Sequence, residues 1–213
     1  MILYYSPGAC SLVAHIALEQ AGADFTLSRV TLAQGEHRTP DYLKINPHAR
    51  VPALDVDGQV ITENIAILNF LASRFHADGS VPLDDPLIAA RCNELLGWCA
   101  STVHIAFAEV WRPERFSPDT AVHAAIEQGG RAALTGFFTE IEGLAGEGWT
   151  VGDRLSAVDC YFLVFFRWGG RIGVDMAAFP RWADLARRVA ERPAVGRALA
   201  TEGYTADDFI AAR

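Results

Sequence analysis

The segment from Val51 to Leu68, VPALDVDGQVITENIAIL, decides the fold of the first part of the chain. It begins with two runs of strand-forming residues, 51–56 and 59–61, that flank Asp57-Gly58. This dipeptide favours a type I′ turn between two antiparallel strands. Thr62-Glu63-Asn64 then opens a helix, because the apolar residues that follow it recur on one helical face. The segment therefore predicts a β-hairpin that leads directly into a helix.

The residues before this hairpin predict a strand, a helix and a second strand. Strand-forming residues occupy 2–5 and 25–32, and helical spacing covers 10–19. Two strands joined by one helix pair in parallel, so these elements predict a βαβ unit. A looser segment at 39–46 is expected to hold a short helix. The order βαβ followed by ββα indicates an α/β domain.

Beyond residue 75 the sequence predicts helices and no convincing strand. Apolar residues at three- or four-residue spacing predict one long amphipathic helix from Ile88 to Val110. Ser156 and Asp159 have the spacing of a capping box, with Leu155 placed to pack against the helix that they begin. The other predicted helices cover 118–144, 160–166, 180–191 and 193–200.

A segment rich in Gly, Pro and Asp, from His76 to Pro86, separates the two patterns. We expect a domain at 1–78, a linker at 79–86 and an all-helical domain at 87–213. The helix at 160–166 is apolar all round and should lie at the centre of the helical bundle.

The composition excludes several classes of protein. The chain has 213 residues, 51% of them apolar, which is enough for a sizeable core and excludes wholesale disorder. A net charge of −8 argues against a nucleic-acid-binding protein, whose surface should be basic. The longest strongly apolar run, 160–166, is far too short for a membrane span, and the first residues do not resemble a signal peptide. We expect neither nucleic acid nor a membrane as a partner.

The four cysteines, Cys10, Cys92, Cys99 and Cys160, show no spacing typical of a zinc site or a redox pair. Cys92 and Cys99 lie about 10 Å apart along one predicted helix, beyond the ~7 Å limit for a disulfide. We therefore expect reduced thiols, no bound metal and a cytoplasmic protein.

Cys10 is the first candidate for chemistry, because it follows a strand and a Pro-Gly turn at the start of a predicted helix. There the helix dipole and free N–H groups favour a thiolate and lower the thiol pKa. Ser11 could supply a second donor, and Tyr4 or Tyr5 could activate a bound thiol. The alternative reading is that Cys10 and the tyrosines only pack in the core.

Two further pairs are candidates for ligand binding. Val51-Pro52 stands at the start of a strand, where a proline is tolerated and the Val51 backbone could pair with an extended peptide. Glu63-Asn64 lies at a helix start, where backbone N–H groups can bind a carboxylate while Glu63 pairs with an ammonium group. Ordinary helix capping is an equally good explanation of the second pair.

Taken together, these pieces resemble the glutathione S-transferases, and the bacterial beta class in particular. The resemblance rests on SPGACS at 6–11, VPAL at 51–54 and TENIAIL at 62–68. It extends over nearly the whole chain through Arg112-Pro113, the Ser156–Asp159 box and ERPAV at 191–195. The implied fold is a thioredoxin-like N-terminal domain (βαβ–ββα) followed by an all-α helical bundle, which agrees with the element pattern.

The resemblance implies that glutathione is the co-substrate. The bond before Pro52 would be cis, and Val51 would pair with the cysteinyl backbone of glutathione. Glu63 would hold the γ-glutamyl ammonium group, and Asn64 with the helix start would hold the adjacent carboxylate. Arg38, in the segment Glu36-His37-Arg38, could contact the glycine carboxylate.

The resemblance also implies a reacting centre at Cys10, beside the glutathione sulfur. His104 matches the family histidine that approaches this sulfur, and Tyr5 and Ser11 remain catalytic candidates. The apolar pocket for the electrophile would be lined by Phe107, Trp111 and Trp168, although core packing is an even alternative for all three. We expect a homodimer.

Two positions depart from the family pattern. Ile105 stands where a lysine is common, and Gly97 replaces an asparagine that reaches across the dimer. The leading expectation is conjugation of the glutathione thiolate to apolar electrophiles, as in detoxification. The alternatives are thiol–disulfide exchange or reductive dehalogenation through Cys10, and a non-catalytic binding or scaffold protein of the same fold.

Overall fold

The N-terminal part is built around a four-stranded mixed sheet with the strand order β2-β1-β3-β4. The strands are β1 (Ile2–Tyr5), β2 (Thr26–Arg29), β3 (Ala53–Val56) and β4 (Gln59–Thr62). β1 pairs in parallel with β2, placing Leu3 opposite Leu27, and antiparallel with β3, placing Leu3 opposite Leu54. The computed structural model describes residues 1–76 and 79–211. This sheet with its helices is the expected thioredoxin-like fold.

The hairpin between β3 and β4 forms as its sequence predicts. Asp57 has φ 54° and Gly58 has φ 86°, the two positive values that a type I′ turn requires. The Asp55 carboxylate accepts a hydrogen bond from the Gly58 N–H at 2.7 Å. The turn holds β4 so that the chain enters the next helix at Glu63.

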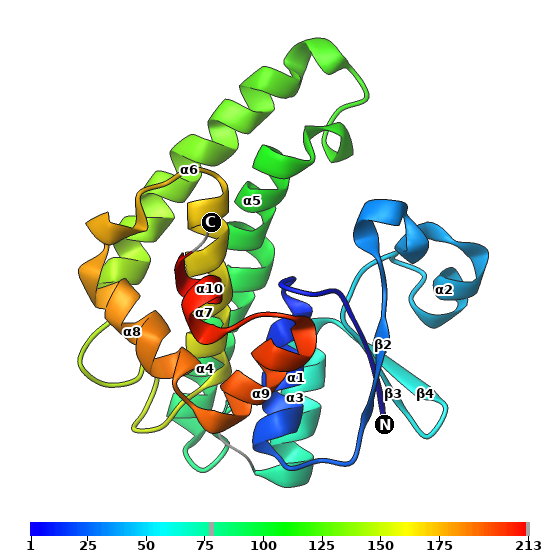
Figure 1. Ribbon diagram of the computed structural model, residues 1–213, viewed down its shortest axis with the longest axis vertical. Helices are drawn as coiled ribbons and strands as arrows, with labels where there is room; N and C mark the ends of the chain where they lie inside the picture. The colour runs from blue at the N-terminus through cyan, green and yellow to red at the C-terminus, as the bar shows by residue number, and fades with distance from the viewer. Residues whose placement is uncertain (77–78, 212–213) are drawn as a thin grey trace.

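Three helices accompany the sheet, namely α1 (Ser11–Gln20), α2 (Pro40–Ile45) and α3 (Asn64–Phe75). Every residue of α1 from Ser11 to Leu18 is buried, because this helix packs against α3 and also against the helical part of the chain. Figure 1 shows α1 and α3 between the sheet and the helical bundle. The helix α1 is therefore packed between α3 and the helical part of the chain.

The rest of the described chain, 79–211, is helical. Its helices are α4 (Pro86–Trp98), α5 (His104–Trp111), α6 (His123–Leu144), α7 (Ala157–Arg171), α8 (Pro180–Ala190), α9 (Pro193–Glu202) and α10 (Ala206–Ala211). α7 is buried from Ala157 to Gly169 and packs against α1, α4, α8 and α10, which confirms the expected central helix (Figure 1). The predicted capping box is present, since the Ser156 N–H donates to the Asp159 carboxylate at 2.8 Å.

Some boundaries differ from the sequence expectation. The long helix predicted at 88–110 is interrupted by a π-helical turn at Cys99–Val103, where an extra residue per turn separates α4 from α5. The helix predicted from residue 118 begins at His123, after a 3₁₀ turn, and α10 was not predicted. The predicted domain boundary at residue 78 lies outside the described residues.

The cysteines are all free and buried. Cys92, Cys99 and Cys160 are fully enclosed in the helical core, as their helical spacing predicts. Among residues 1–76 and 79–211, no helix is long and apolar enough to cross a membrane. In the same ranges, no group of three or more His, Cys, Asp or Glu side chains is placed to hold a metal ion.

Candidate active site

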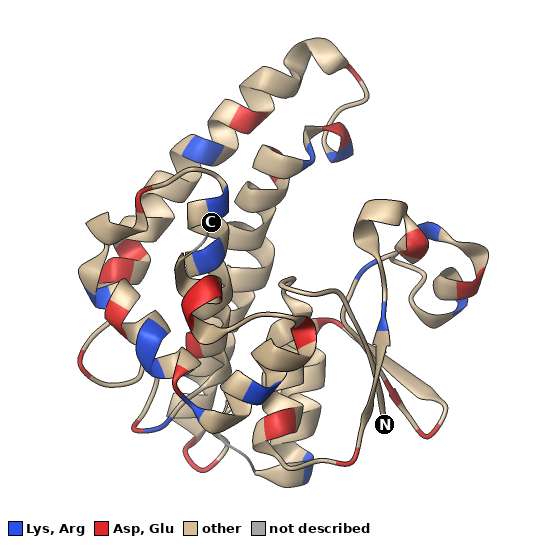
Figure 2. Ribbon diagram, viewed as in Figure 1, with Lys and Arg blue, Asp and Glu red and all other residues tan. Residues whose placement is uncertain are grey.

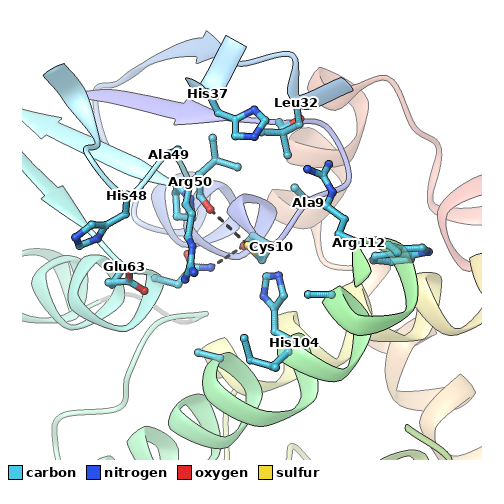
Figure 3. Close-up of a pocket in the computed structure, with 18 of the residues that line it drawn as sticks. Ala9, Cys10, Leu32, His37, His48, Ala49, Arg50, Glu63, His104 and Arg112 are labelled. Carbon is cyan, nitrogen blue, oxygen red and sulfur yellow. Dashed lines mark hydrogen bonds between the residues drawn. The ribbon is translucent and has the colours of Figure 1, made fainter. Parts of the chain in front are cut away.

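A cavity of about 630 Å³ lies where the two parts of the chain face each other. The thioredoxin-like part contributes the turn at 6–10, the segment from Leu32 to Pro52 and the start of α3. The helical part contributes one face of α5 and the end of α7. Figure 3 shows Cys10 near the centre of this cavity, with His104 pointing toward it from α5. The site is therefore formed by both domains.

Cys10 caps the N-terminus of α1 and is 8% exposed. Its thiol donates a hydrogen bond to the Val51 carbonyl oxygen, with 3.6 Å between sulfur and oxygen. Burial raises the pKa of the thiol to about 12, and the backbone N–H groups of Cys10 and Ser11 offset only part of this effect. The N–H groups at the helix start do lower this pKa, as expected, but desolvation outweighs them and the net shift is upward. At neutral pH Cys10 is a thiol and a hydrogen-bond donor.

His104 begins α5 directly after the π-helical turn, and its ring lies 5.0 Å from the Trp168 ring in an edge-to-face arrangement. Burial lowers the pKa of His104 to about 4, and the positive charges of Arg115 and Arg50 lower it further. The imidazole is therefore neutral at physiological pH. A neutral imidazole can donate one hydrogen bond into the cavity without carrying a charge.

The residues expected to bind the glutathione backbone all line the cavity from its thioredoxin-like side. The Val51–Pro52 bond is cis, as the family resemblance implied. Glu63 caps α3 with φ 66°, a left-handed value that is unusual for a residue with a side chain. Val51, Glu63 and Arg38 all line the cavity. Within the described chain, Glu63 has no ion-pair partner, so its carboxylate is free to meet a cation.

The side chain of Asn64 has a different arrangement from the one expected. Its amide N–H₂ group donates to the Cys10 carbonyl oxygen at 2.9 Å and to the Tyr161 hydroxyl at 2.8 Å. Both donors are thus used to connect α3 with α1 and α7. A ligand carboxylate at this place would have to use backbone N–H groups at the start of α3.

Two aromatic side chains form a wall of the cavity on the helical side. Trp111, at the end of α5, is 39% exposed, and its ring lies 5.2 Å from that of Trp168. Ile105 lies on the same face of the cavity and adds apolar surface. This wall can bind a flat apolar molecule close to Cys10.

Three predicted site residues lie outside the cavity. Tyr5 is buried in the core, where its ring packs against His15 at 5.9 Å, so it cannot activate a bound thiol. The Ser11 hydroxyl is fully buried and donates to the Ser6 carbonyl oxygen at 3.2 Å. Phe107 is fully buried behind the wall, stacked on Trp111 at 5.4 Å. None of these three side chains lines the cavity.

A buried polar network that local sequence patterns did not reveal holds the turn before Cys10. The Glu202 carboxylate, at the end of α9, accepts a hydrogen bond from the Gly8 N–H at 2.8 Å and lies 2.9 Å from His15 Nδ1. The Trp168 indole N–H donates to the Gly8 carbonyl oxygen at 2.9 Å. Gly8 itself has φ 67°, and an added Cβ would come within 3.0 Å of the Tyr204 hydroxyl. Because these partners are far apart in sequence, no spacing could have joined them.

Sequence patterns also did not identify most of the arginines around the cavity as site residues. Arg50, Arg112, Arg115 and Arg171 line it in addition to Arg38. Scattered along the chain, they have no motif of their own. A sequence alone does not say which of its surface charges share one cavity.

Comparisons with known proteins agree with this architecture. Residues 1–73 match the family model of the glutathione S-transferase N-terminal domain, and residues 106–193 match that of the C-terminal domain. The glutathione S-transferase GstA of Escherichia coli O157:H7 is 34% identical over 215 residues, covering 95% of this chain and 99% of that protein. A glutathione S-transferase from a sphingomonad, solved with glutathione, is 36% identical, with a TM-score of 0.83 over 95% of this chain and 99% of its own. The beta-class enzyme of Sphingomonas chungbukensis is 34% identical, with a TM-score of 0.82 and the same coverage of both chains.

A thioredoxin-like domain joined to a helical bundle, with a cysteine-centred cavity between them, defines a class of thiol-dependent transferases. The chain belongs to the glutathione S-transferase family and is a transferase, which confirms the family, the fold class and the enzyme class expected from the sequence.

Proposed function

We propose that the protein conjugates glutathione, through its thiolate, to small electrophiles with an apolar body. The observation that carries this proposal is that one cavity contains Cys10, Val51, Glu63 and His104, which come from both domains. The glutathione complexes of similar enzymes support glutathione as the co-substrate.

Glutathione would lie along the edge formed by Val51 and the start of α3. Its cysteinyl backbone would pair with the Val51 N–H and carbonyl groups. The γ-glutamyl ammonium group would meet the Glu63 carboxylate, and the adjacent carboxylate would accept hydrogen bonds from backbone N–H groups of α3, where the helix dipole is positive. Arg38 would bind the glycine carboxylate.

The thiolate of bound glutathione would be stabilised by donors and by positive charge. Cys10 keeps its proton, because its pKa is about 12. When glutathione binds, its S–H would turn from the Val51 carbonyl oxygen and donate to the thiolate sulfur instead. His104, neutral for the reasons given above, would donate an N–H bond from the other side. Arg50 and Arg115 lie close enough to lower the pKa of His104, so their field also acts on a thiolate at this place.

The reaction would use the glutathione sulfur as the nucleophile. Its electron pair forms a bond to the electrophilic carbon, and with an aryl halide the halide leaves with the electrons of the carbon–halogen bond. The enzyme raises the fraction of bound glutathione that is present as thiolate at neutral pH, and it positions the electrophile against Trp111 and Trp168.

Turnover of glutathione and 1-chloro-2,4-dinitrobenzene tests the proposal, with Cys10→Ala and Cys10→Ser as a matched pair. Serine retains a donor and alanine does not. A hydrogen bond to a charged group is worth about 1.5 kcal/mol, so Cys10→Ala should lose roughly tenfold in kcat/KM, and Cys10→Ser much less. Equal and complete loss in both variants would contradict the donor role.

Thiol–disulfide exchange or reductive dehalogenation through Cys10 is the second candidate function. It requires a Cys10 thiolate to attack sulfur, and a pKa of about 12 makes this form rare at neutral pH. Intact-mass analysis after incubation with glutathione disulfide tests it. A glutathione adduct on Cys10, with loss of exchange in Cys10→Ser, would favour this function over conjugation.

A non-catalytic scaffold is the remaining alternative, and Ile105 and Gly97 are its motivation. Calorimetric titration with glutathione separates it from an enzyme, because micromolar binding together with turnover excludes a pure scaffold. We also propose a cytoplasmic homodimer that acts in detoxification. Sedimentation at several protein concentrations tests the oligomeric state.

A further inference from the structure

The charged residues that line the active-site cavity are nearly all basic. They are five arginines, Arg38, Arg50, Arg112, Arg115 and Arg171, and one acid, Glu63. The chain as a whole has 18 basic and 26 acidic residues. Outside the cavity this leaves 13 basic against 25 acidic residues, so the positive charge is concentrated at the site. Figure 2 shows basic residues, with acidic ones among them, after the end of α5 and around α2.

These five arginines also differ from most of the arginines elsewhere in the described chain in their partners. In the ranges that the structure describes, none of the five has a carboxylate within ion-pair distance. Seven arginines elsewhere do, including Arg91 with Glu94 at 2.6 Å and Arg197 with Glu19 at 2.7 Å. The remaining members of that paired set are Arg131, Arg154, Arg181, Arg187 and Arg188.

Four of the cavity arginines, Arg115 with Arg50, Arg112 and Arg38, lie close enough to repel one another. Burial lowers the pKa of Arg115, and the charges of Arg50, Arg112 and Arg38 lower it further, while Glu114 offsets part of the effect. An anion bound among these groups would relieve this repulsion. A carboxylate suits guanidinium groups, because it accepts two parallel N–H bonds.

Glutathione leaves some of these arginines without a ligand. In the proposed binding mode, one of its carboxylates meets the start of α3 and the other meets Arg38. Arg112 and Arg171 lie on the helical side, beside the wall where the electrophile would bind. The Arg171 guanidinium carbon is 5.8 Å from the centre of the Trp111 ring, and Trp168 lies one turn before Arg171 on the same face of α7. Positive charge and aromatic surface therefore occur together at this place.

We propose that the preferred electrophile is an organic acid, with an apolar or aromatic body on Trp111 and Trp168 and a carboxylate bound by Arg171 and Arg112. This inference rests on the proposed conjugation function and specifies the class of its second substrate. The covalent step is unchanged. The glutathione sulfur bonds to the electrophilic carbon, and the leaving group departs with its electron pair. The carboxylate contributes to binding and takes no part in the reaction.

The test compares 4-chloro-3-nitrobenzoate with its methyl ester, two electrophiles that share the ring and the leaving group but differ in the charge of one substituent. Each kcat/KM is divided by the rate constant of the same reaction with glutathione in the absence of enzyme, which corrects for intrinsic reactivity. We expect the corrected value for the acid to exceed that for the ester at least tenfold, and 0.5 M NaCl to reduce this ratio.

Variants then assign the preference to residues. Arg171→Gln should lower the acid-to-ester ratio at least fivefold, and Arg171→Lys should restore part of it. Arg91→Gln removes an exposed arginine outside the cavity and should leave the ratio unchanged. Arg171 is itself exposed, so these variants should fold. An unchanged ratio in Arg171→Gln would overturn the assignment of the carboxylate to Arg171.

Other outcomes separate the inference from the proposed function. Equal or faster turnover of the ester, or turnover of 1-chloro-2,4-dinitrobenzene with neither benzoate compound accepted, overturns the inference and leaves conjugation intact. Absence of turnover with all three electrophiles, together with no glutathione binding, overturns the proposed function and the inference with it.

Discussion

Alanine at Gly130 tests how closely the helix that carries the site is held in place. Gly130 is buried on α6 against α5, and a Cβ added there would lie 2.8 Å from the Ala106 carbonyl oxygen and 2.9 Å from Glu109 Cβ. Backbone atoms cannot move aside alone, so the two helices would have to separate. The neighbouring Gly129 is exposed on the same helix, and a Cβ added there meets nothing within 4 Å.

The magnitude follows from two opposing effects. Both substitutions gain about 1 kcal/mol of helix propensity. Only Gly130→Ala also overpacks the helix contact, which lowers the free energy of unfolding by about 1–3 kcal/mol. Gly129→Ala should therefore be more stable than the unmodified protein, and Gly130→Ala should be less stable than Gly129→Ala by about 1–3 kcal/mol.

Urea unfolding followed by fluorescence measures this difference, provided that the two variants give equal m-values. Since Ala106 lies two residues after His104, Gly130→Ala should also lower kcat/KM for conjugation, and Gly129→Ala should not. Equal stability of the two variants, or a more stable Gly130→Ala, would refute the argument that α5 and α6 are in hard contact at this point.

Two more substitutions test groups buried beside the site. His104 has its pKa lowered from 6.5 to about 4, so the unfolded chain binds more protons than the folded one between these values, and stability falls as the pH drops from about 6.5 to 4. This linkage is worth about 3 kcal/mol. The change in urea midpoint between pH 7 and pH 4.5 should therefore be smaller in His104→Gln than in the unmodified protein. An equal change in both proteins would contradict the assignment to His104. Glu202→Ala leaves the Gly8 N–H and His15 buried without their acceptor, so it should cost about 3–5 kcal/mol and raise KM for glutathione. Thermal unfolding and steady-state kinetics check this, and a variant with unchanged Tm and KM would show that the network does not hold the turn.

Much of the fold could be predicted because its signals are local. The Asp57-Gly58 turn, the helix start at Glu63 and the Ser156–Asp159 capping box each depend on residues a few positions apart. The central position of α7 followed from its continuous apolar sequence. The π-helical turn at Cys99–Val103 could not be predicted, because apolar spacing continues through it without interruption.

The site was predicted less completely, and the errors have physical causes. The position of Cys10 at a helix start was correct, but its pKa depends on burial by the second domain, which the local sequence does not contain. Tyr5 and Ser11 have suitable chemistry, but their side chains point into the core. The contact of Glu202 with Gly8 joins residues 194 positions apart, so only tertiary structure reveals it.

The same contact has a consequence for the synthesis of the protein. During translation the sheet and α1 leave the ribosome first, and N-terminal domains generally fold as they emerge. The acceptor for the Gly8 N–H is made 194 residues later, and the Trp168 indole that binds the carbonyl oxygen of the same glycine is made 160 residues later. A nascent chain can therefore build its sheet early, yet it acquires the turn beside Cys10 in its final form only when α9 has docked.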